Sequence, residues 1–120
     1  MFYQSIQKSV TNYQKRNTMV LSTSSLKKST NKKFGKMINQ YKVIRTLGKG
    51  AFATVRLCND ISTDQSYALK EMSKSELKKK IQSKGRTAYD CVLEELKVLQ
   101  KLEHPNIIWL HEIIDDPDKD

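Results

Sequence analysis

The sequence is poor in residues that mark several large classes of protein. Its 120 residues include two cysteines, two prolines and four glycines. Cys58 and Cys91 lie far apart, and neither a CxxC pair nor a histidine cluster accompanies them. A disulfide framework and a zinc site are therefore not indicated, and we expect a reducing, cytoplasmic setting.

Long apolar runs are also missing. The longest is IIWL at 107–110, whereas a membrane-spanning helix needs about 20 predominantly apolar residues. No signal-peptide core follows Met1. We therefore expect a soluble protein without a transmembrane segment, and with 38% hydrophobic residues the chain can build one small domain with a modest core.

The net charge of +9 is unevenly distributed. Residues 1–40 hold eight Lys or Arg and no acidic residue, which gives +8, while 41–120 hold fourteen basic and thirteen acidic residues, which gives +1. The excess charge thus belongs to a tail. Nucleic acid is not favoured as a partner, because the remainder is nearly neutral and aromatic residues are not interleaved with the basic run.

Residues 1–38 are predicted to be a disordered basic tail, because Ser, Thr, Asn and Lys bury too little apolar surface to offset the entropy of ordering. Phe2, Ile6, Val10 and Tyr13 recur at helical spacing. This leaves open a weak amphipathic helix on an anionic membrane surface, or an organelle transit segment. A solvated tail is favoured, since the stripe is short. The domain is expected at 39–120.

From residue 41 onward the pattern predicts a compact order of elements. Alternating residues indicate strands at 41–50, 53–60, 66–72 and 107–114, and the polar turn ISTDQS joins the second and third into an antiparallel hairpin. A lysine-rich stretch at 73–86 has no clear pattern, and a helix is predicted from Thr87 to Leu102. The result is an α+β fold with an antiparallel sheet of about four strands and one main helix.

The glycine-containing stretch LGKGAFATV at 47–55 connects the first predicted strand to the second. Gly48 and Gly50 let the backbone approach a ligand closely and adopt positive φ, so that amides can face phosphate oxygens. An ordinary hairpin turn has the same residues. A dinucleotide-binding loop would lead into a helix, and a Walker loop would end in Gly-Lys-Ser/Thr. If the stretch binds a ligand, the remaining interpretation is a strand-loop-strand lid over a nucleotide.

Lys70 lies in the strand at 66–72. Because side chains alternate along a strand, Ala68, Lys70 and Met72 share one face, while Tyr67 and Leu69 share the other. A lysine in a strand is usually solvated. Here an alanine on the same face leaves room for a flat ligand.

Glu95 falls in an unexpected place on the predicted helix. On a helical wheel, Val92, Leu99 and Leu102 cluster near Ala88, and Glu95 projects into the middle of that apolar sector. Burying an unpaired carboxylate costs several kcal/mol. Glu95 is therefore expected to be buried beside a cation, with Lys70 the natural partner, unless the sector rim reaches water.

Taken together, LGKGAFATV, YALK, EELKVLQKL and EHPNIIWL resemble, in order and spacing, the small lobe of a eukaryotic protein kinase. The resemblance covers Tyr41 to Asp120. Two longer stretches, 39–55 and 101–120, are most similar to calcium/calmodulin-dependent kinase kinases, with the liver kinase B group next.

The resemblance implies roles for individual residues. Leu47, Val55 and Ala68 would enclose adenine, Lys70 would hold the α- and β-phosphates of ATP, and Glu95 would orient Lys70 through an ion pair. Leu99 and Leu110 would form part of a hydrophobic spine, and His104, Pro105 and Asn106 would fix the helix exit. The phosphates would be covered by Gly48, Lys49, Gly50, Ala51, Phe52 and Ala53.

The sequence also departs from the family pattern. Ala53 replaces the third glycine, and no hinge, H-R-D loop or D-F-G aspartate follows the fourth strand, so the ligands for Mg²⁺ are missing. We expect the chain alone not to transfer phosphate. The family's fifth strand is missing too, which predicts a gap in the sheet, unpaired edges, weak stability and weak nucleotide binding.

Two functions therefore stay open. In the first, the chain is part of an ATP-dependent serine/threonine kinase that acts on protein substrates, and calmodulin is a partner of a longer form. Alternatively, it is a short non-catalytic module that occupies a kinase's partner surface through its helix and unpaired strands.

Overall fold

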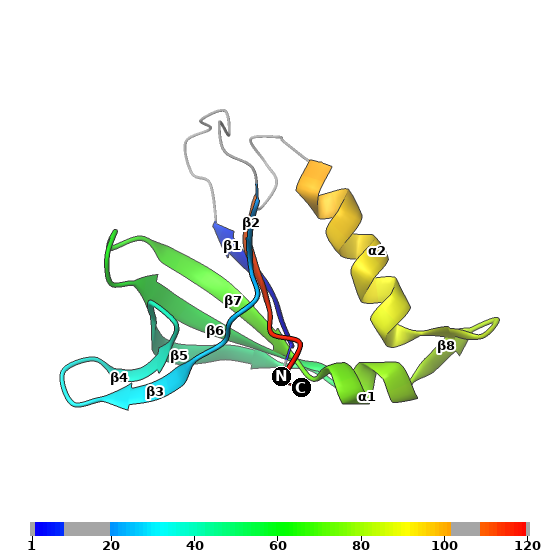
Figure 1. The fold of residues 1–120 in the computed structure, drawn as a ribbon, viewed down its shortest axis with the longest axis horizontal. Helices are drawn as coiled ribbons and strands as arrows, with labels where there is room; N and C mark the ends of the chain where they lie inside the picture. The colour runs from blue at the N-terminus through cyan, green and yellow to red at the C-terminus, as the bar shows by residue number, and fades with distance from the viewer. Residues whose placement is uncertain (1, 9–19, 102–108, 120) are drawn as a thin grey trace.

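The computed structural model describes residues 2–8, 20–101 and 109–119, with side chains described for 20–98 and 110–119. These residues form one large, mostly antiparallel sheet with two helices at one end (Figure 1). The α+β class expected from the sequence is confirmed, with more strands than the four predicted. The strands follow in chain order: β1 (Phe2–Lys8), β2 (Leu21–Thr23), β3 (Lys28–Asn31), β4 (Gly35–Ile38), β5 (Tyr41–Lys49), β6 (Ala53–Asp60), β7 (Ser66–Met72), β8 (Ile81–Ser83), β9 (Arg86–Thr87) and β10 (Trp109–Asp115).

The central hairpin follows the predicted pattern closely. β6 and β7 have the predicted bounds and pair antiparallel, with Val55 opposite Lys70 and Leu57 opposite Ala68. This register places Val55, Leu57, Ala68 and Lys70 on one face of the sheet. The opposite face carries Leu69 and other residues of the main core.

The strand β1 is the largest difference from the expected fold. The sheet order is β2-β10-β1-β7-β6-β5-β4-β3, so residues 2–8 lie between β7 and β10 and pair antiparallel with both. The gap predicted there is thus filled by the chain's own N-terminal segment. Residues 2–8 form neither disordered tail nor amphipathic helix, because main-chain groups of two neighbouring strands are available to them.

Residues 21–38, hereafter called the strap, were also expected to be disordered, but they contain three strands. β2 pairs parallel with β10, and β4 pairs antiparallel with β5. The strap therefore covers both edges of the sheet formed by β10, β1, β7, β6 and β5 (Figure 1). Between those strands, Leu26 is buried in the main core with Ile38 and Tyr41.

A polar contact shows how strongly the sheet curls. In a flat sheet, β5 and β10 would lie roughly 19 Å apart, because four strand spacings of about 4.8 Å separate them. Yet the Tyr41 hydroxyl on β5 donates to Glu112 on β10, and Thr23 donates to the second oxygen of that carboxylate. Burial, followed by the bond to Glu112, raises the pKa of Tyr41. The Glu112 carboxylate is buried and accepts hydrogen bonds from these two hydroxyl donors.

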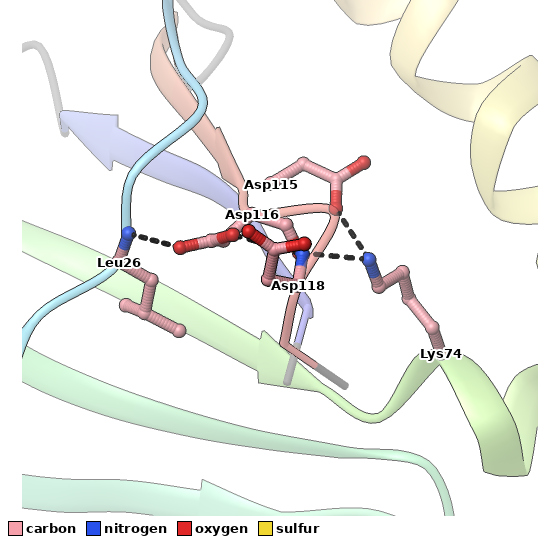
Figure 2. Close-up of polar contacts among 5 residues, drawn as sticks. All are labelled: Leu26, Lys74, Asp115, Asp116 and Asp118. Carbon is pink, nitrogen blue, oxygen red and sulfur yellow. Dashed lines mark hydrogen bonds and ion pairs between the residues drawn. The ribbon is translucent and has the colours of Figure 1, made fainter.

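The end of β10 fastens the strap and the first helix, α1 (Lys74–Lys79). Figure 2 shows Asp116 accepting the backbone N–H of Leu26 at 3.0 Å and that of Asp118 at 2.9 Å. These bonds lower the pKa of Asp116. Lys74 donates to Asp115 at 3.0 Å. The stretch 115–118 thus holds both the strap and the start of α1.

The stretch 73–86, which had no clear pattern, contains three short elements. The Ser73 side chain caps α1 by accepting the N–H of Glu76. β8 and β9 form a hairpin through Lys84 and Gly85, whose φ angles of 46° and 77° suit a two-residue turn. The capping pair S-x-x-E and the dipeptide KG were the overlooked signals.

The long helix α2 (Ala88–Lys101) agrees with the predicted helix within a residue at each end. Thr87 begins it, because its hydroxyl accepts the N–H of Asp90 while the Asp90 carboxylate accepts the N–H of Thr87. α2 contacts α1, β9 and β10. Figure 1 shows α2 standing beside the sheet, and Leu96 in its C-terminal half packs in one cluster with Leu110 of β10.

Candidate nucleotide site

A cavity of about 440 Å³ lies between the β5–β6 turn, β7 and the two helices. It brings together the predicted residues of the turn with Val55, Lys70 and Glu95. The lining is completed by residues that sequence reasoning did not assign to a site, namely Met72, Leu77, Gln82, Ala88, Cys91 and Val92. Several of these are apolar core positions of α1 and α2, and nothing in the sequence distinguishes them from ordinary packing residues.

The glycine-containing stretch forms a tight turn between two strands, as the sequence predicted. The Gly50 N–H donates to the Ala53 carbonyl at 2.7 Å. Positive φ is found at Gly35 and Gly85, and not at Gly48 or Gly50. A Cβ added at Gly48 would meet nothing within 4 Å, and one at Gly50 would meet only the Ala53 carbonyl oxygen at 3.8 Å. The fold itself therefore does not require glycine at either position.

Lys70 and Glu95 line the same cavity but do not form the expected ion pair. Lys70 is half-buried on β7, and Glu95 is exposed on α2. The ion pairs found between described side chains are Lys28–Glu71, Arg56–Glu71, Lys74–Asp115 and Arg86–Glu94. The prediction that Glu95 is buried is wrong in this structure.

The exposure of Glu95 follows from how α2 packs. Its buried stripe consists of Ala88 and Leu96 with the half-buried Val92 between them, at a spacing of four residues. Leu93 and Val98 are exposed. The packed stripe is thus narrower than the apolar arc of the helical wheel, and Glu95 lies beside it, on the side that faces the cavity.

The remaining predicted residues lie outside the cavity lining. Leu47 is 44% exposed, Gly48 and Lys49 lie on β5, and Ala68 lies on β7 on the same face as Lys70. Leu110 is buried in the cluster that includes Ala88 and Leu96. The side chain of Leu99 and residues His104, Pro105 and Asn106 lie outside the described part of the chain.

The two thiols are expected to differ sharply in reactivity. Cys91 is exposed at the cavity wall, whereas Cys58 is fully buried. Burial raises the pKa of the Cys58 thiol to about 11, so at pH 8 only about one molecule in a thousand carries its reactive thiolate. Mass spectrometry after brief iodoacetamide treatment should find one label, on Cys91. Labelling of Cys58 at a similar rate would contradict the burial of this thiol. As a control, unfolding in urea should make Cys58 react as well.

The described residues contain neither a candidate metal site nor a candidate membrane span. No three His, Cys, Asp or Glu side chains in these residues are grouped so that they could hold a metal ion. No helix in the described ranges is long and apolar enough to cross a membrane.

Comparison with known proteins identifies a family for most of the chain that follows the strap. The family model of the protein kinase domain matches residues 41–119. A probable serine/threonine-protein kinase of Dictyostelium discoideum is 41% identical over 86 residues, which are 71% of this chain and 12% of the relative. Serine/threonine-protein kinases GRIK1 and GRIK2 of Arabidopsis thaliana are 36% and 35% identical over 84% and 88% of this chain, and each alignment covers 26% of the relative.

A strand-turn-strand segment beside a strand lysine and a helix glutamate, in an antiparallel sheet with two helices, is consistent with a small lobe of the kinase type. The chain belongs to the protein kinase domain family. It spans between 12% and 26% of the length of these relatives.

Proposed function

We propose that the cavity bordered by Lys70 and the Gly50–Ala53 turn binds ATP, and that the chain is the ATP-binding part of a serine/threonine protein kinase. The observation that carries the proposal is the convergence of this turn, Lys70 and Glu95 on one cavity of about 440 Å³. The family match and the printed names of the relatives support the same reading.

The residues present fit the phosphate end of the nucleotide. Lys70 supplies a half-buried cation beside the Gly50–Ala53 turn, and Val55 and Met72 supply apolar wall. ATP, when bound, supplies the phosphoryl group that kinases transfer. In this proposal Leu47 and Ala68 contact adenine, while Gly48, Lys49, Ala51, Phe52 and Ala53 cover the phosphates. Mg²⁺ and its ligands are assigned to the complete kinase.

Glu95 has a conditional role in this proposal. It orients Lys70 only after α2 approaches β7, because the two side chains border one cavity without an ion pair. The structure with an exposed Glu95 is then an unassembled arrangement of the lobe, and assembly requires movement of α2.

The experiment replaces Lys70 by Met in the full chain and measures binding of a fluorescent ATP analogue. A charged hydrogen bond contributes about 1.5–3 kcal/mol, so affinity should fall about ten- to a hundredfold. Lys42→Met is the matched control, since Lys42 on β5 does not line the cavity. Iodoacetamide labelling of Cys91 should also slow in the presence of ATP. Equal affinity of the Lys70→Met variant and the unmodified chain would remove Lys70 from this role.

The finer assignments depend on a complete kinase. We propose protein serine and threonine residues as substrates, a cytoplasmic location and membership of the calcium/calmodulin-dependent kinase kinase or liver kinase B group. Calmodulin is proposed only as a partner of a longer form, and the domain boundary near residue 39 stays a prediction. The alternative, a non-catalytic module, would contact its partner through unpaired strands. The facing edges of β7 and β10 are not unpaired, because both pair with β1, so this alternative is not favoured.

A further inference from the structure

A second cavity of about 280 Å³ lies on the opposite face of the sheet, between the β3–β4 hairpin and strands β5 to β7. Its apolar part consists of Met37 and Ile38, which are buried, and Val43, which is half-buried. The volume is near the lower end of ligand-binding pockets, which begin at about 300 Å³. None of its lining residues borders the cavity that contains Lys70.

The polar lining of this second cavity is strongly unbalanced in charge. It holds three cations, Lys28, Lys36 and Arg56, and one carboxylate, Glu71. Glu71 already contacts two of the cations, with Arg56 Nε at 3.3 Å and Lys28 Nζ at 3.7 Å from its oxygens. The lining therefore has an excess of two positive charges.

Two further contacts define where an anion would fit. Arg56 is held in place by Glu71 and by Thr46, whose hydroxyl accepts a hydrogen bond from Nη1 at 3.1 Å. The Lys36 side chain is exposed, and its ammonium forms no hydrogen bond or ion pair with the described residues. A positioned guanidinium and a free ammonium beside one cavity suit a phosphate or carboxylate group.

We propose that this cavity binds a small organic anion. Its phosphate or carboxylate lies near Lys36 and Arg56, and its apolar body contacts Ile38 and Val43. The apolar lining favours an organic ligand over a bare inorganic ion, because an inorganic ion would leave the half-buried Val43 without an apolar neighbour in the cavity. The hydroxyl of Thr30, which lies opposite Lys36 in the β3–β4 register, adds a hydrogen-bond donor.

The test is a titration of the ¹⁵N-labelled full chain, followed by amide chemical shifts. Phenyl phosphate is the probe, with inorganic phosphate, benzyl alcohol and benzylammonium as comparisons. Phenyl phosphate should bind saturably and more tightly than the other three, and should shift the amides of Ser29, Thr30, Lys36 and Met37. Its affinity should fall as salt is raised, since charged groups at this partly open site are screened.

Two lysines on the same hairpin supply a matched pair of variants. Lys36→Gln should weaken phenyl phosphate binding about two- to fivefold, in line with a partly exposed charge pair. Lys32→Gln, with the same loss of charge in the β3–β4 turn outside the cavity, should leave the affinity unchanged. Both positions are exposed, so neither change threatens the fold.

Several outcomes would overturn the proposal. Equal affinity for inorganic phosphate and phenyl phosphate would show that the basic side chains bind phosphate and that the apolar lining contributes nothing. Equal weakening by Lys32→Gln and Lys36→Gln would show general charge attraction. Shifts confined to the residues around Lys70, or no saturation at all, would also contradict it. ATP binding at the Lys70 cavity is unaffected by any of these results, so the two proposals fail separately.

Discussion

A chain without residues 1–8 is expected to lose its cooperative unfolding transition. β1 has five register pairs with β10 and five with β7, so its removal separates β10 and β2 from the other five strands of the sheet. Ile114 of β10 would lose its fixed place in the core beside Tyr67 and Leu69. Because whole domains are stable by only about 5–15 kcal/mol, most of the folding free energy should disappear.

The measurement is thermal and urea unfolding followed by circular dichroism, together with size-exclusion chromatography. The truncated chain should show a broad transition and should self-associate, because the edges of β7 and β10 become available to other chains. An unchanged midpoint with an unchanged urea dependence would contradict the position of β1 in the sheet.

A point substitution separates main-chain pairing from the loss of eight residues. Gln7→Pro removes a backbone N–H at a position that pairs with both Leu110 and Ala68, and proline is tolerated poorly within such a strand. Gln7→Ala retains that N–H. We therefore expect a lower urea midpoint for the proline variant than for the alanine variant, and equal midpoints would count against pairing on both edges of β1.

The sequence predicted the central hairpin and the long helix because local signals and tertiary structure agree there. In β6 and β7, strict alternation coincides with one face packed in the core and the other toward the cavity. Thr87 and Asp90 mark the start of α2 through a reciprocal cap. In each case the residues that determine the element are close together in the sequence.

The strands before residue 39 were not predicted because their stability comes from partners far away in the chain. All four residues of β3 are exposed, so no buried face gives them a period. β2 and β4 are ordered at the two edges offered by β10 and β5. A polar composition favours disorder only when no sheet edge is available, and single-sequence patterns carry no information about that edge.

The candidate site was predicted in part for a related reason. Alternation along β7 correctly placed Lys70 on the face shared with Ala68. The helical wheel placed Glu95 in a packed sector because it assumed that the entire apolar arc of α2 meets the sheet. Among the described side chains of α2, Ala88, Tyr89, Val92 and Leu96 pack in the core cluster, whereas Glu95 borders the cavity and Leu93 and Val98 are exposed. The distance between a helix and a sheet depends on the neighbouring elements, so the sequence of the helix alone does not predict which part of its apolar arc is buried.

The second large effect is expected at Leu26, where the strap enters the core. This side chain is 6% exposed and packs in the cluster of Ile38, Tyr41 and Ile114. Leu26→Asp places a carboxylate among apolar side chains, and Asp116 already binds the backbone N–H of the same residue. We expect a loss of about 3–5 kcal/mol, measured as a lower urea midpoint, because an uncompensated buried charge costs that much. Leu21→Asp, at a strap position that is 50% exposed, should cost about 1 kcal/mol or less.

A comparison of Leu26→Asp with Leu26→Asn isolates the charge, since the two side chains have nearly the same size. Burial raises the folded-state pKa of a carboxyl group above its unfolded value of about 3.9. The penalty of the Asp variant is therefore largest above the folded pKa and disappears as the pH falls below the unfolded value. At pH 7 the Asp variant should unfold at lower urea than the Asn variant, and the two should converge near pH 3.5. A constant difference between these variants across the same pH range would mean that position 26 stays in contact with water, and that the strap does not close the core.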